Sequence, residues 1–495
     1  MKNKKLILSA FLCLALSSCG DYRGASRPYS YAPESAMSIW IPPKSIRKSP
    51  IIIDEVDPLE LSSNDLTLAE IIDITLINNP LTKESWYDAR AAAAKYGQSL
   101  AKYYILTDLD SFYENTRKAL FSRNARIIQQ EVFYGGELSA TYTILDFGRR
   151  KATSSAAREA LYEADFMHNR TLQEVVHTIM NDYYTYLSQI AQVHAAEQDV
   201  YRAQVSLDAV NDRFSQGTAD IGDQAQAITK LMQQKLNLVT QKKYETTYYT
   251  ELLSNMGMPA NAYLTFVSYP EELQLFEIAD LSKMIAMATK FRPDLLASEA
   301  TVRSYHDKYD LAVDQKYPKV TGDFSFGRKY TNLGASDYYD YDATIKFTLP
   351  LFQGFNIQNN IKKARAELRS KEASLRDLQL ELLQEVTAYY NDVLFSKESY
   401  AYAKEYLSAS ITDFKLNLEK YQMGTTNIVD LINAQTAVAD AQYQLINSEK
   451  TWYTSIANLA YSTGVISNNP EEDVNLEDEG DLLNPCYHKV SDEKK

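Results

Sequence analysis

The chain has 495 residues, of which 45% are hydrophobic and 23% are charged, so it can form a packed core and is not disordered throughout. The formal net charge of −14 argues against a nucleic-acid-binding protein, because a phosphate backbone is bound by a basic surface. The acidic excess fits either a solvated surface or an acidic pore interior. Tyrosine is frequent, at 37 residues, and suits surfaces that are wet on one side and apolar on the other.

The N-terminus has the pattern of a lipoprotein signal peptide. Three lysines lie within the first five residues, and residues 6–16 form an apolar stretch that is too short to span a bilayer. Leu16–Cys19 resembles a lipobox, which predicts cleavage before Cys19 and acylation of that residue. An ordinary secretory signal with a chance cysteine is the alternative. With Cys19 acylated and Cys13 removed, Cys486 alone remains, so no intramolecular disulfide is expected.

After Cys19, a proline-rich segment predicts an extended arm that lies along the outside of a helical body. An internal duplication follows it. Leu68–Pro80 matches Leu281–Pro293 at an offset of 213 residues, and Arg213–Asp223 matches Lys420–Asp430 at an offset of 207 residues. The first copy therefore holds six extra residues ahead of position 145. A long repeat at constant spacing indicates duplication of a supersecondary unit.

Each copy is predicted to contain a β-hairpin. Val320–Tyr330 and Tyr339–Leu349 alternate between apolar and polar residues, as does 137–144 in the first copy, while its partner near 107–113 alternates less well. A loop that takes up the extra residues is expected between them, containing Arg117, Lys118, Arg123 and Arg126. A single soluble hairpin also alternates, but its recurrence in an exported chain favours strands of a membrane barrel. Four strands cannot close a barrel, so an inserted chain must oligomerise.

The rest of each copy is predicted to be helical. Residues 149–214 and 356–421 contain neither proline nor glycine and repeat apolar residues at spacings of three and four, which is a heptad-like seam. At 1.5 Å per residue such helices reach ~100 Å. They stop near Gly217 and Gly424, where glycine suits a left-handed helix end, and a second long helix runs back. Each copy is therefore an antiparallel helical pair with a turn at one end and a β-hairpin at the other.

This layout resembles the TolC-like family of outer-membrane efflux and secretion channels over roughly residues 66–465. Leu145–Arg149 and Pro350–Gly354 resemble the strand-to-helix junctions of the family, and Gly217-Thr218 and Gly424-Thr425 resemble its helix-tip turns. The resemblance implies a mainly α fold with a membrane β-barrel portion: a homotrimer with twelve strands, four per chain, above a tunnel of twelve helices. It also implies that Gly217, Thr218, Gly424 and Thr425 dock a periplasmic adaptor (membrane fusion) protein of an inner-membrane transporter.

The resemblance further implies a gate at the periplasmic tip. Tyr421 and Asp223 match a Tyr–Asp link between neighbouring helix tips, and Asp430 matches one carboxylate of an acidic ring. The two aspartates are equally well explained as acids favoured by a helix N-terminus. Three positions depart from the family: Asn433 replaces a second ring carboxylate, Thr426 an arginine, and Gly222 the hydroxyl residue that the arginine would meet. These departures weaken the negative ring and the second link.

The sequence contains no recognisable catalytic pattern. The five histidines lack a metal-like i, i+4 spacing, and neither a Gly-rich phosphate loop nor a Gly-x-Ser-x-Gly elbow is present. We therefore predict a protein that is not an enzyme and has no cofactor, catalytic residue or metal site. An enzyme on a helical scaffold is the least favoured hypothesis.

The predicted function is passive conduction through an outer-membrane exit duct of a tripartite efflux pump or type I secretion system. The chain would be lipid-anchored at Cys19, with its helical body in the periplasm, and would contact outer-membrane lipid but no nucleic acid. The alternative is a lipid-anchored periplasmic coiled-coil scaffold without a conducting barrel. The predicted units are a signal peptide (1–18), the arm (19–65), repeat 1 (66–262), repeat 2 (263–466) and an acidic polar tail (467–495).

Overall fold

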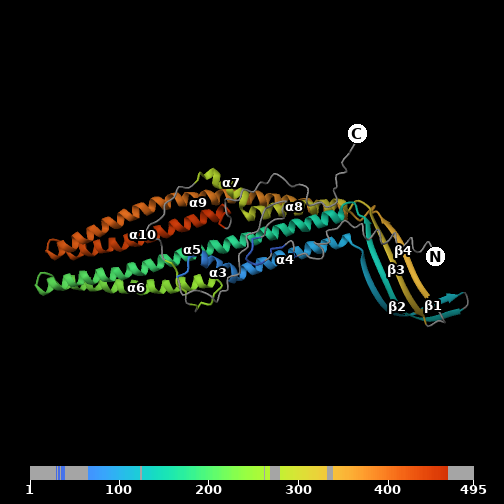
Figure 1. Cartoon of the computed structure of the whole chain (residues 1–495), viewed down its shortest axis with the longest axis horizontal. Coiled ribbons are helices and arrows are strands. Elements are labelled where there is room, and N and C mark those ends of the chain that lie inside the picture. Colours follow the sequence, from blue (N-terminus) through green and yellow to red (C-terminus); the bar gives the residue numbers. More distant parts are fainter. Residues whose placement is uncertain are drawn as a thin grey trace.

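The computed structural model describes residues 29, 32–33, 35–39, 65–122, 125–260, 262, 264–267, 279–331 and 338–466. The predicted signal peptide, Cys19 and the C-terminal tail lie outside these residues. The described chain is elongated, with two long helical hairpins side by side at one end and a curved sheet at the other (Figure 1). None of the described helices combines the length and the apolarity needed to cross a bilayer.

The elements occur twice in the same order. The first set is α3 (Leu68–Asn78), α4 (Pro80–Leu100), β1 (Leu106–Ser122), β2 (Ala125–Leu145), α5 (Arg149–Ser215) and α6 (Ile221–Asn255), with a short 3₁₀ turn at Ala101–Tyr103. The second set is α7 (Leu281–Phe291), α8 (Pro293–Asp314), β3 (Lys319–Thr331), β4 (Tyr338–Thr348), α9 (Asn356–Gln422) and α10 (Ile428–Ser462). Both α5 and α9 have 67 residues, and both α6 and α10 have 35, so the helices keep the 207-residue offset at both ends.

The four strands form one antiparallel sheet in the order β1-β2-β3-β4, which leaves β1 and β4 as its edges. Its register places the apolar positions of neighbouring strands opposite one another. Leu109 faces Leu138, Leu138 faces Phe326, and Phe326 faces Tyr341. All four side chains are about half exposed or more. One face of the sheet is thus largely apolar and uncovered in the single chain, although Ser111 and Arg328 also lie on it.

The first hairpin is longer than the sequence analysis predicted. The basic segment around Arg117 was expected to be a loop, but β1 and β2 remain paired from Tyr113↔Tyr134 to Ser122↔Ala125. That expectation is wrong because backbone hydrogen bonds hold the ladder, and these do not require the side chains to alternate. Arg123 itself lies outside the described residues.

Each strand-to-helix junction contains two consecutive residues with positive φ, at Phe147-Gly148 and at Gly354-Phe355. The order of phenylalanine and glycine is reversed between the copies, so the backbone turn is kept while the residues differ. Gly148 has no side chain to cap α5. The Asp146 carboxylate caps the helix instead, because its Oδ2 accepts the backbone N–H of Arg150 at 2.9 Å. The predicted junctions at Leu145–Arg149 and Pro350–Gly354 are confirmed.

The core is a series of small clusters along the helices. Helix α5 is in contact with α4, α6, α8 and α10, and is therefore surrounded, whereas α9 packs mainly on α8 and α10. The few described residues of the arm lie on α4 and α5. The Trp86 indole donates to the carbonyl of Pro33 at 2.7 Å, and the carbonyl of Ser38 lies 3.1 Å from His168 Nε2.

Candidate functional site

The two helix tips are built identically. Gly217 and Gly424 have φ values of +70° and +78°, which end α5 and α9 in the left-handed region. The following threonines then cap the helices, because the Thr218 hydroxyl donates to the carbonyl of Arg213 and the Thr425 hydroxyl to that of Lys420, each at 3.1 Å. All four predicted docking residues are exposed at the tips. They form the exposed end of each hairpin.

The two aspartates of the predicted gate lie in the first turns of the return helices. The backbone N–H of Asp223 is capped by Asp220 Oδ1 at 2.9 Å, and that of Asp430 by Asn427 Oδ1 at 2.8 Å. The Asp430 carboxylate also accepts the hydroxyl proton of Thr426 at 2.9 Å. Both carboxylates thus occupy positions that the helix dipole favours. Asp430 is exposed and remains available to a neighbouring chain.

Tyr421 is fully buried at the tip, in a core cluster shared by all four long helices. Burial, and then the charge of Asp223, raise the pKa of its hydroxyl, so the two groups are near one another. No hydrogen bond joins them, and the hydroxyl has no partner among the described residues. The contact that does hold Tyr421 comes from Arg213, whose Nη1 donates to the Tyr421 carbonyl at 2.9 Å. Sequence reasoning missed Arg213, although its place just before the predicted tip turn was the available signal.

The two hairpins of the chain meet through α5 and α10. The Ser206 hydroxyl of α5 donates to Gln435 Oε1 of α10 at 3.4 Å, and both residues are buried. Their counterparts in the other copy, Asp413 on α9 and Ile228 on α6, are exposed. The same holds nearer the tip, where Ile428 of α10 is 3% exposed and its counterpart Ile221 of α6 is 75% exposed. The outer faces of α6 and α9 therefore repeat the inner contact surfaces but have no partner in the single chain.

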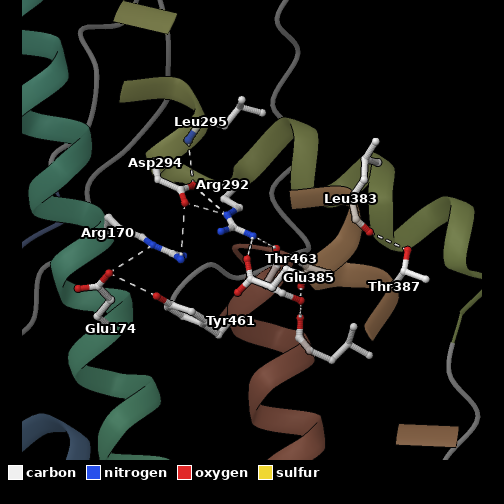
Figure 2. A network of polar contacts seen from close by, with 12 residues as sticks. Arg170, Glu174, Arg292, Asp294, Leu295, Leu383, Glu385, Thr387, Tyr461 and Thr463 are labelled. Atoms are coloured by element: carbon white, nitrogen blue, oxygen red, sulfur yellow. Dashed lines mark hydrogen bonds and ion pairs between the residues drawn. The ribbon is translucent and has the colours of Figure 1, made fainter. Parts of the chain in front are cut away.

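A network of buried charges ties the two repeats together at the other end of α10 (Figure 2). The Arg292 side chain is 5% exposed, and its Nε donates to the Asp294 carboxylate at 2.9 and 3.0 Å while Nη1 pairs with Glu385 at 2.5 Å. Arg170 of α5 lies 3.6 Å from Asp294 and stacks on the Tyr461 ring at 3.9 Å. The network thus joins α5, α8, α9 and α10.

Arg292 repeats the role of a neutral residue in the first copy. Asn79, 213 residues earlier, donates to the carbonyl of Asn255, the last residue of α6, at 2.8 Å. Arg292 approaches the carbonyl of Ser462, the last residue of α10, at 3.4 Å. The sequence signal was present in the matching Asn-Pro and Arg-Pro pairs, but the buried acids that Arg292 meets come from distant parts of the chain.

One group of side chains brings possible metal ligands together within the described residues. The ligand atoms of His306, Asp307 and Asp310 on α8 lie within 4.8 Å of one another, and His306 Nδ1 is 3.4 Å from Asp310 Oδ2. The group contains a single histidine, so the spacing between histidines in the sequence does not reveal it. His306 is exposed, and the arrangement is that of an i, i+4 pair on a helix surface.

Long paired helical hairpins that continue into an open amphipathic sheet define this chain as the protomer of an outer-membrane channel. The chain belongs to the outer membrane efflux protein family, whose model matches residues 71–257 and 284–465. The resemblance proposed from sequence motifs is thereby confirmed, as is the fold class.

Curated relatives match most of the chain at low identity. The protein CyaE of Bordetella pertussis is 23% identical over 88% of this chain and 90% of its own length. The outer membrane protein TolC of Escherichia coli strain K12 is 22% identical over 81% of this chain and 82% of its own length.

Solved structures share the fold. The outer membrane protein VceC of Vibrio cholerae superposes with a TM-score of 0.72 at 15% identity, covering 80% of this chain and 96% of its own. The outer-membrane channel CmeC of Campylobacter jejuni gives a TM-score of 0.73 at 16% identity, over 85% and 94% of the two chains.

Proposed function

We propose that this protein is the outer-membrane exit duct of a tripartite efflux pump or type I secretion system. In this proposal three copies form a twelve-stranded barrel and a tunnel of twelve helices, through which substrates pass without chemical change. An inner-membrane transporter supplies the energy, and a periplasmic adaptor joins it to the tips at Gly217-Thr218 and Gly424-Thr425. Cys19 carries the lipid anchor, repeats 1 and 2 span 66–262 and 263–466, and the helical body lies in the periplasm.

The sheet is the observation that carries this proposal. Its apolar positions share one face on all four strands, and that face is exposed, with Leu109 at 79% and Ile345 at 76%. Its two edges are open, and edges are not tolerated in lipid. Closure of a barrel by neighbouring copies removes both open edges, because β1 of one chain then pairs with β4 of the next.

Aromatic and aliphatic side chains at the junction of sheet and helices support the same placement. Leu351, Phe352 and Phe355 are exposed at 88%, 74% and 63%. They lie just where β4 ends and α9 begins. A belt of such side chains at the end of a membrane sheet suits the lipid–water interface. We place the periplasmic surface of the outer membrane at this level.

The experiment inserts charge on each face of one strand. Ile345→Arg puts a cation on the proposed lipid face, where it costs about 2–4 kcal/mol near the membrane centre. Thr344→Arg puts the same side chain on the opposite face. We expect trimers in the outer-membrane fraction and conductance in planar bilayers for the wild type and Thr344→Arg, and loss of both for Ile345→Arg. Equal behaviour of the two variants would contradict the barrel.

The scaffold alternative is distinguished by the anchor. A chain exported by an ordinary signal peptide, with Cys19→Ser, stays embedded in the outer membrane if the sheet forms a barrel. It is released into the soluble periplasmic fraction if the acyl chains are the sole attachment. Reconstituted protein that is folded and trimeric yet never conducts, even with its tip residues substituted, would also support the scaffold.

A further inference from the structure

The exposed outer faces of α6 and α9 can be matched residue by residue to the contact that α5 and α10 make within the chain. In that contact Gln442 Nε2 of α10 donates to Gln198 Oε1 of α5 at 3.2 Å. The 207-residue offset that relates α5 to α9 also relates α6 to α10. It places Glu405 of α9 at the position of Gln198, and Lys235 of α6 at the position of Gln442.

We propose that Lys235 of one copy pairs with Glu405 of the next, and that this ion pair marks the boundary between subunits. The inference rests on the proposed trimeric duct. Both side chains are exposed, and neither is engaged by a charged or hydrogen-bonding partner in the part of the chain that the structure describes. The contact between chains would thus hold a pair of opposite charges at the positions where the contact within the chain holds a pair of amides.

The apolar surroundings agree with the same register. The exposed Met232 and Val239 of α6 correspond to Ala439 and Ile446 of α10, which line the clefts on either side of the α5–α10 contact. On α9, Tyr406 is 44% exposed, whereas its counterpart Asp199 on α5 is 5% exposed. Both outer faces are therefore more apolar than a solvated helix face requires, and each flanks its charged residue.

The change from amides to charges sorts the two kinds of contact. Around a ring, α10 must select the α5 of its own chain, and α6 must select the α9 of a neighbour. If the helices were exchanged, Lys235 would face Gln198 and Gln442 would face Glu405, so the ion pair would be lost. A charge pair at one contact and an amide pair at the other therefore favours the correct arrangement, as charged positions do in coiled coils.

Cysteine pairs test the register in the full-length chain with Cys486→Ser. The pair Gln198→Cys with Gln442→Cys serves as the reference, because the two positions are in contact within the chain. It is used to find an oxidant or a short bis-thiol linker that joins cysteines at such positions. With that reagent, Lys235→Cys with Glu405→Cys is expected to give covalent dimers and trimers on a non-reducing gel. Lys235→Cys with Glu398→Cys is the matched control, because Glu398 is also exposed and lies one heptad away.

Charge reversal tests the energetics. Lys235→Glu or Glu405→Lys removes all three ion pairs of the trimer at once. Each exposed pair contributes a factor of about two to five to the equilibrium constant for trimer formation. We expect the trimer-to-monomer ratio in mild detergent to fall about tenfold or more in each single variant and to recover in the double exchange.

The outcomes separate the inference from the function. Trimers that form and conduct, but link through 235 and 398 rather than 235 and 405, or that ignore charge reversal, would overturn the proposed pair and keep the duct. A wild-type chain that never forms trimers would overturn the duct itself.

Discussion

Arg213 Nη1 donates to the carbonyl oxygen of Tyr421 at 2.9 Å, and the guanidinium lies 4.5 Å from the centre of the Tyr421 ring. A second nitrogen, Nη2, donates to the carbonyl of Thr218 at 3.0 Å. One side chain thus fastens the end of α9 to the tip turn of the other hairpin. Arg213 therefore supplies a tie between the tips of the two hairpins.

Removal of this tie is expected to loosen the tip. Arg213→Ala removes the two hydrogen bonds that the guanidinium donates to backbone carbonyls, and hydrogen bonds to charged groups contribute roughly 1.5–3 kcal/mol each. We expect larger and longer single-channel openings than in the wild type. Arg213→Lys keeps the charge but not the forked geometry, so it should fall between the two. Tyr421→Phe is the companion variant, and we expect it to increase the channel openings less than Arg213→Ala does. An unchanged conductance in Arg213→Ala would show that this tie is not part of the gate.

Asp430 is predicted to set the charge preference of the closed tip. Three copies would bring three exposed carboxylates to one constriction, and rings of acidic side chains favour cations. Asp430→Ala should lower the ratio of cation to anion permeability, whereas Asn433→Asp, which adds a second ring, should raise it. Reversal potentials in a salt gradient measure both ratios. If neither variant moves the reversal potential, Asp430 acts only as an acid in the first turn of α10, where the helix dipole favours it.

Gly464 is predicted to be much more sensitive to substitution than Gly217, although both residues end a helix. Its φ is +76°, and an added Cβ would lie 2.9 Å from the Cα of Arg292. Gly217 has a similar φ of +70°, but an added Cβ would meet no atom within 4 Å. Gly217→Ala should therefore cost about 1 kcal/mol, whereas Gly464→Ala should cost about 1–3 kcal/mol more. Thermal unfolding of the two variants compares the costs, and equal losses would mean that the Arg292 backbone gives way freely.

Loss of the central cation of the buried network, Arg292, is predicted to destabilise the folded protein strongly. Arg292→Leu leaves Glu385 without its cation and Asp294 with only the more distant Arg170, and breaking a buried pair in this way costs about 3–5 kcal/mol. The control is Arg369→Leu, which removes an exposed partner of Glu372 and should change stability by less than about 1 kcal/mol. Denaturant midpoints of the detergent-solubilised proteins provide the comparison. A small effect at Arg292 would show that water or rearrangement compensates the two acids.

Asp165 is predicted to make the protein less stable at alkaline pH. The residue is fully buried on α5, neither carboxylate oxygen has a hydrogen-bond partner among the described residues, and burial raises its pKa to about 9. The folded chain keeps this proton while the unfolded chain loses it near pH 4, so stability falls as the pH rises from about 4 to about 9. The slope is at most about 1.4 kcal/mol per pH unit for one proton.

The measurement is the melting temperature between pH 7 and pH 9. Asp165→Asn keeps the shape of the side chain and has no proton to lose, so it should flatten the dependence. His168, whose pKa burial lowers to about 4, is neutral in the folded chain throughout this range. In the unfolded chain it loses its proton near pH 6.5, so its contribution is small, opposite in sign and gone by about pH 8. A wild-type slope that persists in Asp165→Asn would assign the effect to another group.

Much of the site could be derived from local patterns. The tip turns required glycine at positions with positive φ, and Gly217 and Gly424 stand where two uninterrupted heptad seams end. The two strands of the second hairpin, Val320–Tyr330 and Tyr339–Leu349, were predicted almost to their ends, because the period of two is strong there. The first hairpin was predicted too short, because side chains of its distal half do not alternate in the same way.

The sequence by itself determined the duplication, the long helices, the turns and the sheet, because each of these follows from a short-range period or from a glycine that no other residue replaces easily. The tertiary structure alone decided that Arg213 reaches Tyr421, that Arg292 meets Glu385, and that α5 is surrounded while α9 is left open. These contacts join residues separated by about 90 to 210 positions, and their geometry depends on how the hairpins cross. No local sequence pattern predicts that crossing, because an apolar helix face has the same residue spacing whether it packs on a helix of its own chain or of another chain.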